Sequence, residues 1–167
     1  GTYIDGIIAY NGDRNHGIMS HTLSWGGATA KLWSEGGGAG WTGSWGAIEG
    51  LSPDVFIVDL GTNEEAGNVT AGYETYLDNL VKHLRSTYGK PVVLLAVPKG
   101  NGVSQAAHDV IMAARYSVAR NNGGVLICDL DYRGLPWNTT LMMDDLHFSD
   151  VMHEYVAWNM ADFLFGN

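Results

Sequence analysis

The stretch that decides the fold is Pro53-Asp54-Val55-Phe56-Ile57-Val58-Asp59-Leu60-Gly61-Thr62-Asn63-Glu64. Its middle part, Val55–Leu60, is a short apolar run bounded by a proline and a glycine, which is typical of a buried strand. Polar residues follow directly, among them Asn63. Because functional groups collect at the carboxyl ends of strands in open α/β sheets, this stretch predicts both a core strand and a site residue.

The chain that follows this strand alternates between helical and strand patterns. Apolar residues at helical spacing predict a helix that starts near Tyr73 and is closed by Gly89. Pro91 then opens a second apolar strand, Val92–Val97. The residues expected on the buried side of the helix are Tyr73, Tyr76, Leu77, Leu80, Val81 and Leu84.

The pattern repeats toward the C-terminus. We expect a helix over Ala106–Arg120, a third strand over Val125–Cys128 and a last helix over Val151–Phe165. The inward positions expected in these two helices are Val110, Ala113, Ala114 and Val118, and then Val156, Met160 and Phe163. Buried strands alternating with long helices predict a three-layer α/β/α fold with a mostly parallel sheet.

The N-terminal part is less regular. Tyr3–Tyr10 fits a short amphipathic helix, Ile18–Trp25 fits a strand, and Ala28–Trp33 fits a helical turn. The chain thus begins on a helix, whereas a protein built from βαβ units ordinarily begins on a strand.

Length and composition limit the possible functions. The 167 residues suit one domain, and 46% hydrophobic against 16% charged residues suit a packed core. Nine Lys and Arg against 18 Asp and Glu give a net charge of −9, which disfavours nucleic acid or an anionic membrane as partner. Cys128 is the only cysteine, and no apolar run is long enough to span a membrane. Because neither a basic segment nor an apolar run follows Gly1, we expect no secretory signal within this sequence.

Three short motifs lie at the predicted carboxyl edge of the sheet. Asp144 and His147 are three residues apart, so the carboxylate can hold the imidazole through a ring N–H. Asn63 can donate to a developing oxyanion, and so can the uncovered backbone N–H of Gly27. Each motif has a plain structural alternative, which is a helix cap for the first pair and a turn for Asn63 and Gly27.

In combination these motifs resemble those of the SGNH hydrolases, also called GDSL esterases and lipases. That family carries a Gly-Asp-Ser block, a Gly after the second strand, Gly-x-Asn-Asp after the third and Asp-x-x-His before the last helix. Trp25-Gly26-Gly27-Ala28-Thr29 is similar to the second block, and Gly61-Thr62-Asn63-Glu64 to the third, with Glu64 for Asp. Asp144-Asp145-Leu146-His147 is similar to the last.

The resemblance covers most of the chain and implies a carboxylic ester hydrolase with a flavodoxin-like sheet, with residues 1–167 as a single domain. It implies that His147 is the general base and later the general acid, and that Asp144 orients it. It also implies that Gly27 and Asn63 form the oxyanion hole together with the nucleophile. We expect no cofactor and no metal.

The nucleophile block departs from the family pattern. The chain contains no Gly-Asp-Ser, and the nearest string, Gly12-Asp13-Arg14, has Arg in the nucleophile position. We therefore expect another polypeptide, or an N-terminal fragment of the same precursor, to supply the first strand and the serine. In the alternative, Ile7–Tyr10 is the central strand and the site lacks its serine, with Ser20 and Ser24 as weak substitutes.

A Gly- and Trp-rich stretch, Ser34–Gly50, follows the second block and is expected to border the site. Because aromatic faces suit sugar rings, Trp25, Trp41 and Trp45 are candidate substrate-binding residues, and an O-acetylated carbohydrate is the preferred substrate. This substrate suits a secreted or extracellular protein. The competing function is a catalytically dead carbohydrate-binding domain. A G-x-G-x-x-G match within the stretch lacks the strand and helix that a nucleotide site requires.

Overall fold

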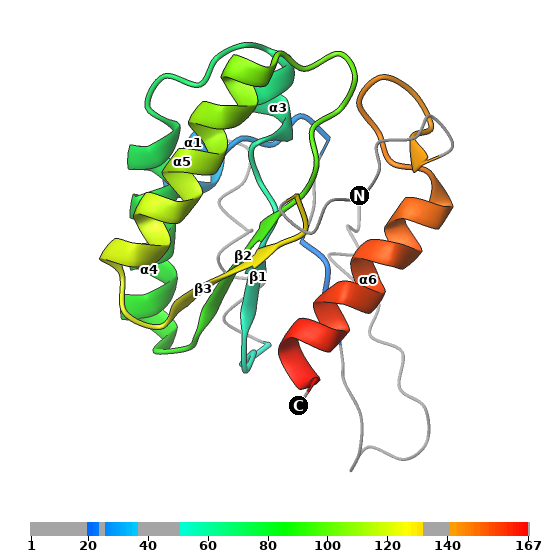
Figure 1. Cartoon of the computed structure of the whole chain (residues 1–167). Coiled ribbons are helices and arrows are strands. Elements are labelled where there is room, and N and C mark those ends of the chain that lie inside the picture. Colours follow the sequence, from blue (N-terminus) through cyan, green and yellow to red (C-terminus); the bar gives the residue numbers. More distant parts are fainter. Residues whose placement is uncertain (1–19, 24–25, 37–50, 132–140, 167) are drawn as a thin grey trace, which may run out of the picture.

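The computed structural model describes residues 20–23, 26–36, 51–131 and 141–166, and Figure 1 shows their arrangement. A parallel sheet lies between two layers of helices, with α4 and α5 on one face and α6 on the other. The predicted α/β/α architecture is therefore confirmed. The elements are α1 (Ala30–Ser34), β1 (Phe56–Val58), α3 (Thr62–Ala66), α4 (Tyr73–Tyr88), β2 (Val92–Ala96), α5 (Gln105–Asn121), β3 (Val125–Asp129) and α6 (Asp150–Phe165).

The three described strands are parallel and lie in the order β1-β2-β3. β2 is the middle strand, with Val92 in register with Phe56 on one side and Val125 on the other. All five residues of β2 are buried, as expected for a strand covered on both faces. Its side chains alternate, since Leu94 packs in the core beneath α4 and α5 whereas Leu95 packs in the core beneath α6.

The predicted buried side of α4 is confirmed with one exception. Five of its six apolar positions are buried and Tyr76 is only partly buried. Gly89 caps the helix with a φ of 68°, in the left-handed region that glycine adopts without strain, and its N–H donates to the Arg85 carbonyl.

The predicted buried side of α5 is wrong by about one position. Val110 is 48% exposed and Ala113 is exposed, whereas Ala114 and Val118 are buried as expected. The buried stripe passes through Ala107 and Ile111, and it also contains two polar residues, His108 and Arg115. A pattern based on apolar residues excludes these two, because it cannot detect polar side chains that find partners inside the protein.

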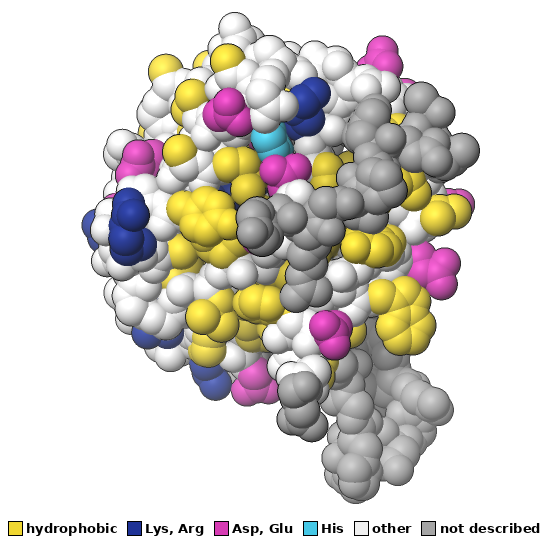
Figure 2. Space-filling model, viewed as in Figure 1, with side chains coloured by type: hydrophobic (Ala, Val, Ile, Leu, Met, Phe, Trp, Pro, Cys, Tyr) yellow, Lys and Arg dark blue, Asp and Glu magenta, His cyan; other side chains and the backbone are white. Residues whose placement is uncertain are grey.

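α6 buries Met152 fully, and its other packing residues are half-buried. Val156 and Phe163 contact the core beneath this helix, as predicted, but Trp158 is 70% exposed. On the face shown in Figure 2, exposed apolar side chains form separate groups, and the Lys and Arg side chains lie apart from one another. None of the helices in the described ranges has the length and apolar character needed to cross a membrane.

The structure departs from prediction before and after β1. The strand comprises Phe56–Val58, three residues within the predicted Val55–Leu60, and the short helix α3 was not predicted. Residues 20–23, the described part of the predicted strand Ile18–Trp25, are irregular. They pair with no described strand, and a strand without a partner has no ladder to hold it. The predicted helix Tyr3–Tyr10 lies outside the described residues.

Candidate active site

Gly61 turns the chain from β1 into α3. Its φ is 131°, and an added Cβ would lie 2.9 Å from the Arg115 guanidinium, so the turn requires glycine. The preceding carbonyl, that of Leu60, accepts hydrogen bonds from Arg115 Nη2 at 2.7 Å and from the Tyr73 hydroxyl at 2.8 Å. Bonds from α4 and α5 thus fix the turn, which places Asn63 in the first turn of α3.

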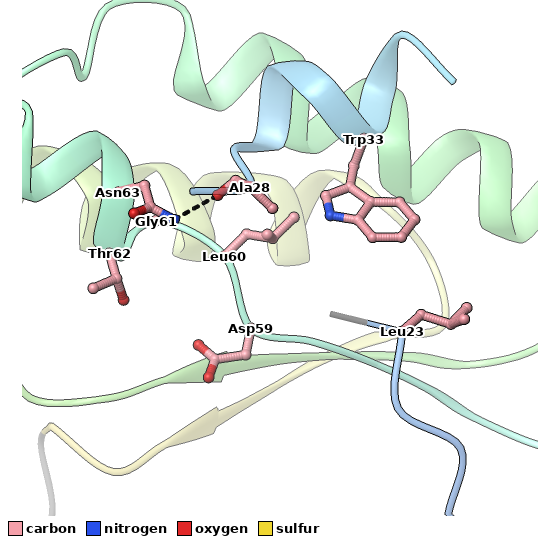
Figure 3. A pocket seen from close by; sticks show the side chains of 8 residues that line it. All are labelled: Leu23, Ala28, Trp33, Asp59, Leu60, Gly61, Thr62 and Asn63. Carbon is pink, nitrogen blue, oxygen red and sulfur yellow. Dashed lines mark hydrogen bonds between the residues drawn. The ribbon is translucent and has the colours of Figure 1, made fainter. Parts of the chain in front are cut away.

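Two side chains of α3 hold the loop that leads into α1. The Asn63 side-chain amide donates to the Ala28 carbonyl oxygen at 2.8 Å, as Figure 3 shows. The backbone N–H of Ala30 donates to Glu64 Oε1 at 2.6 Å. Gly27, at the start of this loop, is exposed and has a φ of 80°. The structure therefore brings together the segments that carry Gly27 and Asn63, the two predicted oxyanion donors.

A pocket of about 220 Å³ opens between this loop and the end of β1. Figure 3 shows that Asn63 and Ala28 face each other at one end of it, and that Asp59 and Leu23 lie farther along. Its lining residues are Leu23, Ala28, Trp33, Asp59, Leu60, Gly61, Thr62 and Asn63. The pocket therefore contains apolar surface, a carboxylate and an amide, the mixture that small ligand sites have.

Two carboxyl groups at this end of the sheet are held toward their neutral forms. Desolvation raises the pKa of Glu64, whose other oxygen, Oε2, has no hydrogen-bond partner among the described residues. Desolvation also raises the pKa of Asp59, although the residue as a whole is exposed, and the nearby Arg115 and His153 only partly oppose that shift. Of the two, Asp59 lines the pocket, and a perturbed carboxyl group in a pocket is common at functional sites.

Asp144 and His147 form the contact that their spacing predicted. Asp144 Oδ2 lies 2.8 Å from His147 Nδ1, and Oδ1 accepts the backbone N–H groups of Leu146 and His147, each at 2.7 Å. These bonds from His147 and Leu146 lower the pKa of Asp144 to about 2. An ionised carboxylate at Nδ1 favours the tautomer with the proton on Nδ1, which leaves the Nε2 lone pair open as a base.

The loop that carries this pair is anchored at the carboxyl end of β2. The N–H of Gly102 donates to the Asp145 carbonyl at 3.0 Å. At Gly100 an added Cβ would lie 2.5 Å from the same oxygen, so the two backbones are in close contact there. The imidazole itself is accessible, with 64% of the His147 side chain exposed. The Asp–His pair comes after β3 in the chain, but its loop contacts the segment that follows β2, whereas the Asn63 helix follows the neighbouring strand β1.

This arrangement contains most of the parts that acyl transfer needs. His147 supplies a base oriented by a carboxylate, and Asn63 retains a second amide N–H for a developing oxyanion. The predicted substrate-binding residues Trp25, Trp41 and Trp45 lie outside the described residues. No group of three metal-ligating side chains occurs in the described ranges.

Sequence reasoning missed a buried polar cluster beside α3. His108 bridges Glu65 and Asp131, and Arg115 donates to the Leu60 carbonyl. One signal was available in the sequence. His108 and Arg115 are seven residues apart, so they lie on the same side of α5, at positions where helical spacing would lead one to expect apolar residues.

Comparisons with known proteins give the family and the fold. The model of the GDSL-like lipase/acylhydrolase family matches residues 6–155. A search of curated protein sequences finds no match. Among solved structures, a carbohydrate esterase family 3 protein from Talaromyces cellulolyticus has a TM-score of 0.67 at 17% identity, with 83% of this chain and 67% of that chain covered.

Two further solved structures are similar to a comparable degree. A lipase/acylhydrolase from Enterococcus faecalis has a TM-score of 0.64 at 18% identity, with 83% of this chain and 71% of that chain covered. An acetyl esterase mutant with an acetate ion has a TM-score of 0.65 at 17% identity, with 83% and 67% covered. At these identities the likeness shows the fold alone.

The fold and the matching family model define the class of this protein, a hydrolase with the SGNH fold. The chain belongs to the GDSL-like lipase/acylhydrolase family. The resemblance inferred from its motifs is thereby confirmed, and so is its class as a carboxylic ester hydrolase.

Proposed function

We propose that this chain hydrolyses carboxylic esters through a serine acyl-enzyme, with His147 as the base. The observation that carries the proposal is the 2.8 Å contact between Asp144 and His147 Nδ1 in a member of an acylhydrolase family. Asp144 orients the ring, and the Asn63 amide and the Gly27 N–H stabilise the oxyanion.

The steps follow from these roles. The serine hydroxyl oxygen bonds to the acyl carbon while His147 Nε2 takes the hydroxyl proton, and negative charge collects on the former carbonyl oxygen. The intermediate then breaks its bond to the alcohol, which leaves with that proton. Water then reacts with the acyl-enzyme through the same two steps, and the carboxylic acid is released.

The direct test is His147→Ala in the native protein, together with the segment that supplies the serine. We expect it to remove turnover of p-nitrophenyl acetate without changing the circular dichroism spectrum, because 64% of this side chain is exposed and it supports little of the core. Unchanged turnover would refute the role of His147.

We propose further that the nucleophilic serine lies on a segment outside these 167 residues, which adds a strand beside β1. No Gly-Asp-Ser occurs in the chain, and among the described strands β1 pairs only with β2. The pocket between Leu23 and the end of β1 offers room for the turn that would follow such a strand. The segment would come from a second polypeptide or from an N-terminal fragment of the same precursor.

Labelling with a fluorophosphonate tests the source of the serine, because the reagent modifies only an activated hydroxyl. Mass spectrometry of the modified peptide should identify a serine beyond residues 1–167 in the native protein. Modification of Ser20 or Ser24 would overturn this part of the proposal. A complete lack of labelling would favour the second candidate function, a carbohydrate-binding domain without activity, which the missing serine motif also favours.

The substrate that we propose is an O-acetylated carbohydrate. Two proteins of similar fold are described as a carbohydrate esterase and an acetyl esterase, and Trp41 and Trp45 lie in a stretch expected to border the site. Such a substrate also suits action outside the cell. This choice is tested by comparing acetate release from acetylated xylan with p-nitrophenol release from p-nitrophenyl butyrate.

A further inference from the structure

His108 is a buried histidine held between two carboxylates. It lies in the second turn of α5, and the residue is 2% exposed. Its Nδ1 is 3.0 Å from Glu65 Oε1, and its Nε2 is 3.2 Å from Asp131 Oδ2. The three side chains come from α5, from α3 and from the turn after β3, so a single ring links three elements.

The two contacts define the charge of the ring. A neutral imidazole has one N–H, so it can donate to only one carboxylate and must turn a lone pair toward the other. An imidazolium donates to both. Burial lowers the pKa of His108, but the hydrogen bonds and charges of Glu65 and Asp131 outweigh burial, and the net change is upward.

Other charged groups lie around this cluster. Asp59 at the end of β1 and Glu64 in α3 are close enough to Glu65 for its charge to raise their pKa values, and Arg115 in α5 lowers them. The two carboxyl groups in direct contact with the ring are Glu65 and Asp131, and a positive ring at His108 balances one of their negative charges.

We propose that His108, as an imidazolium between Glu65 and Asp131, is a positioning residue that fixes α3 and thereby orients the Asn63 amide. Asn63 and Glu65 are two residues apart in a helix of only five residues, which has little stability of its own. The contact between the charged ring and Glu65 holds this helix in place. Only the catalytic consequence rests on the proposed esterase function.

Nuclear magnetic resonance of the full chain tests the charge and the coupling directly. With ¹⁵N-labelled protein we expect both His108 ring nitrogens to be protonated at pH 7. We also expect the Asn63 side-chain amide signals to shift at the same pH midpoint as His108. In Glu65→Gln both midpoints should fall together, because the ring loses one of its anionic partners. A neutral His108 at pH 7, or an Asn63 amide that does not follow its titration, would overturn the proposal.

Kinetics test the consequence for the reaction. In Glu65→Gln we expect kcat for p-nitrophenyl acetate to fall about 10- to 100-fold, since small displacements of a catalytic donor have large effects. KM should change less than about threefold, because the residue does not touch substrate. Glu74→Gln, at an exposed position of α4, is the matched control and should retain full activity.

The readouts separate this proposal from the esterase proposal. A folded Glu65→Gln protein with unchanged kcat would overturn the positioning role. If the native protein, together with the segment that supplies the serine, does not turn over p-nitrophenyl acetate at all, the esterase proposal fails, while the resonance measurements still decide whether a charged His108 orients Asn63. His108→Gln with His83→Gln as its exposed control provides a second pair, with circular dichroism to confirm folding.

Discussion

The Asn63 side-chain amide donates to the Ala28 carbonyl oxygen at 2.8 Å, and this bond joins α3 to the loop that carries Gly27. A primary amide has two N–H groups, so one can hold the loop while the other remains for substrate. The same bond therefore orients Asn63 and holds the loop that carries Gly27, the two residues that we propose as oxyanion donors. This relationship connects two motifs that are 35 residues apart in the chain.

Replacement of Asn63 by Ala should remove both contributions. We expect kcat for p-nitrophenyl acetate to fall about 10²- to 10³-fold, the usual effect of losing one oxyanion donor. KM should change little, because the oxyanion exists only in the transition state. Steady-state kinetics measure both values. A fall in kcat/KM that came only from KM would argue instead for a binding role.

Glu64 supports the same loop through the Ala30 N–H, and it stands where the family has Asp. In Glu64→Ala the buried N–H loses its partner, so we expect a stability loss of about 1–3 kcal/mol. Glu64→Gln keeps an acceptor oxygen of the same reach and should lose less. Urea unfolding at pH 6 compares the two variants, and equal losses would mean that the bond to Ala30 is not the cause.

Glu64 also makes stability depend on pH in a defined direction. Its pKa is raised in the folded protein, so the folded state binds the proton more tightly than the unfolded state does. The resulting stabilisation is fully present below the ordinary carboxyl value of 4.5 and is lost as pH rises through the folded pKa. The free energy of unfolding of the wild type should therefore fall relative to that of Glu64→Gln as pH rises above 4.5. If the difference in free energy of unfolding between the two proteins does not change with pH, the assignment is contradicted.

Much of the fold could be predicted because local patterns and packing agree. The apolar run at Val92–Val97 forms a strand, and the helical spacing that ends at Gly89 forms α4, since each pattern matches one period and one stop signal. The pattern in Ile18–Trp25 also predicted a strand, but residues 20–23 are irregular. A strand depends on a neighbour, and sequence pattern does not reveal whether the neighbour is present.

The candidate site was predictable where its residues are close in sequence. Asp144 and His147 are three residues apart, so their contact follows from spacing alone. The cluster of Glu65, His108 and Asp131 was not predictable from sequence. Glu65 is 43 residues from His108, Asp131 is 23 residues from it, and the three belong to different parts of the fold. Buried polar partners are identified only when the packing brings them together.

Asp144→Asn tests the orientation of His147. The amide can present an N–H to the ring and favour the wrong tautomer, so we expect kcat to fall by about 10²- to 10⁴-fold. Because the pKa of Asp144 is about 2, the wild-type carboxylate stays ionised above about pH 4. Protonation of Asp144 therefore cannot explain any loss of wild-type activity between pH 5 and pH 7. A pH–rate profile of both proteins checks this expectation.

The last prediction concerns the support of the loop that carries His147. In Gly100→Ala the new Cβ would lie 2.5 Å from the Asp145 carbonyl oxygen, a distance that forces the two backbones apart. Overpacking of this kind typically costs about 1–3 kcal/mol, and displacement of a catalytic base by 1 Å can cost about 100-fold in rate. Gly123→Ala is the matched control, because its Cβ would meet no atom within 4 Å. The midpoint temperature of thermal unfolding and kcat should both fall for Gly100→Ala and stay unchanged for Gly123→Ala. Full activity of a folded Gly100→Ala protein would show that the loop can move without displacing His147 from its working position.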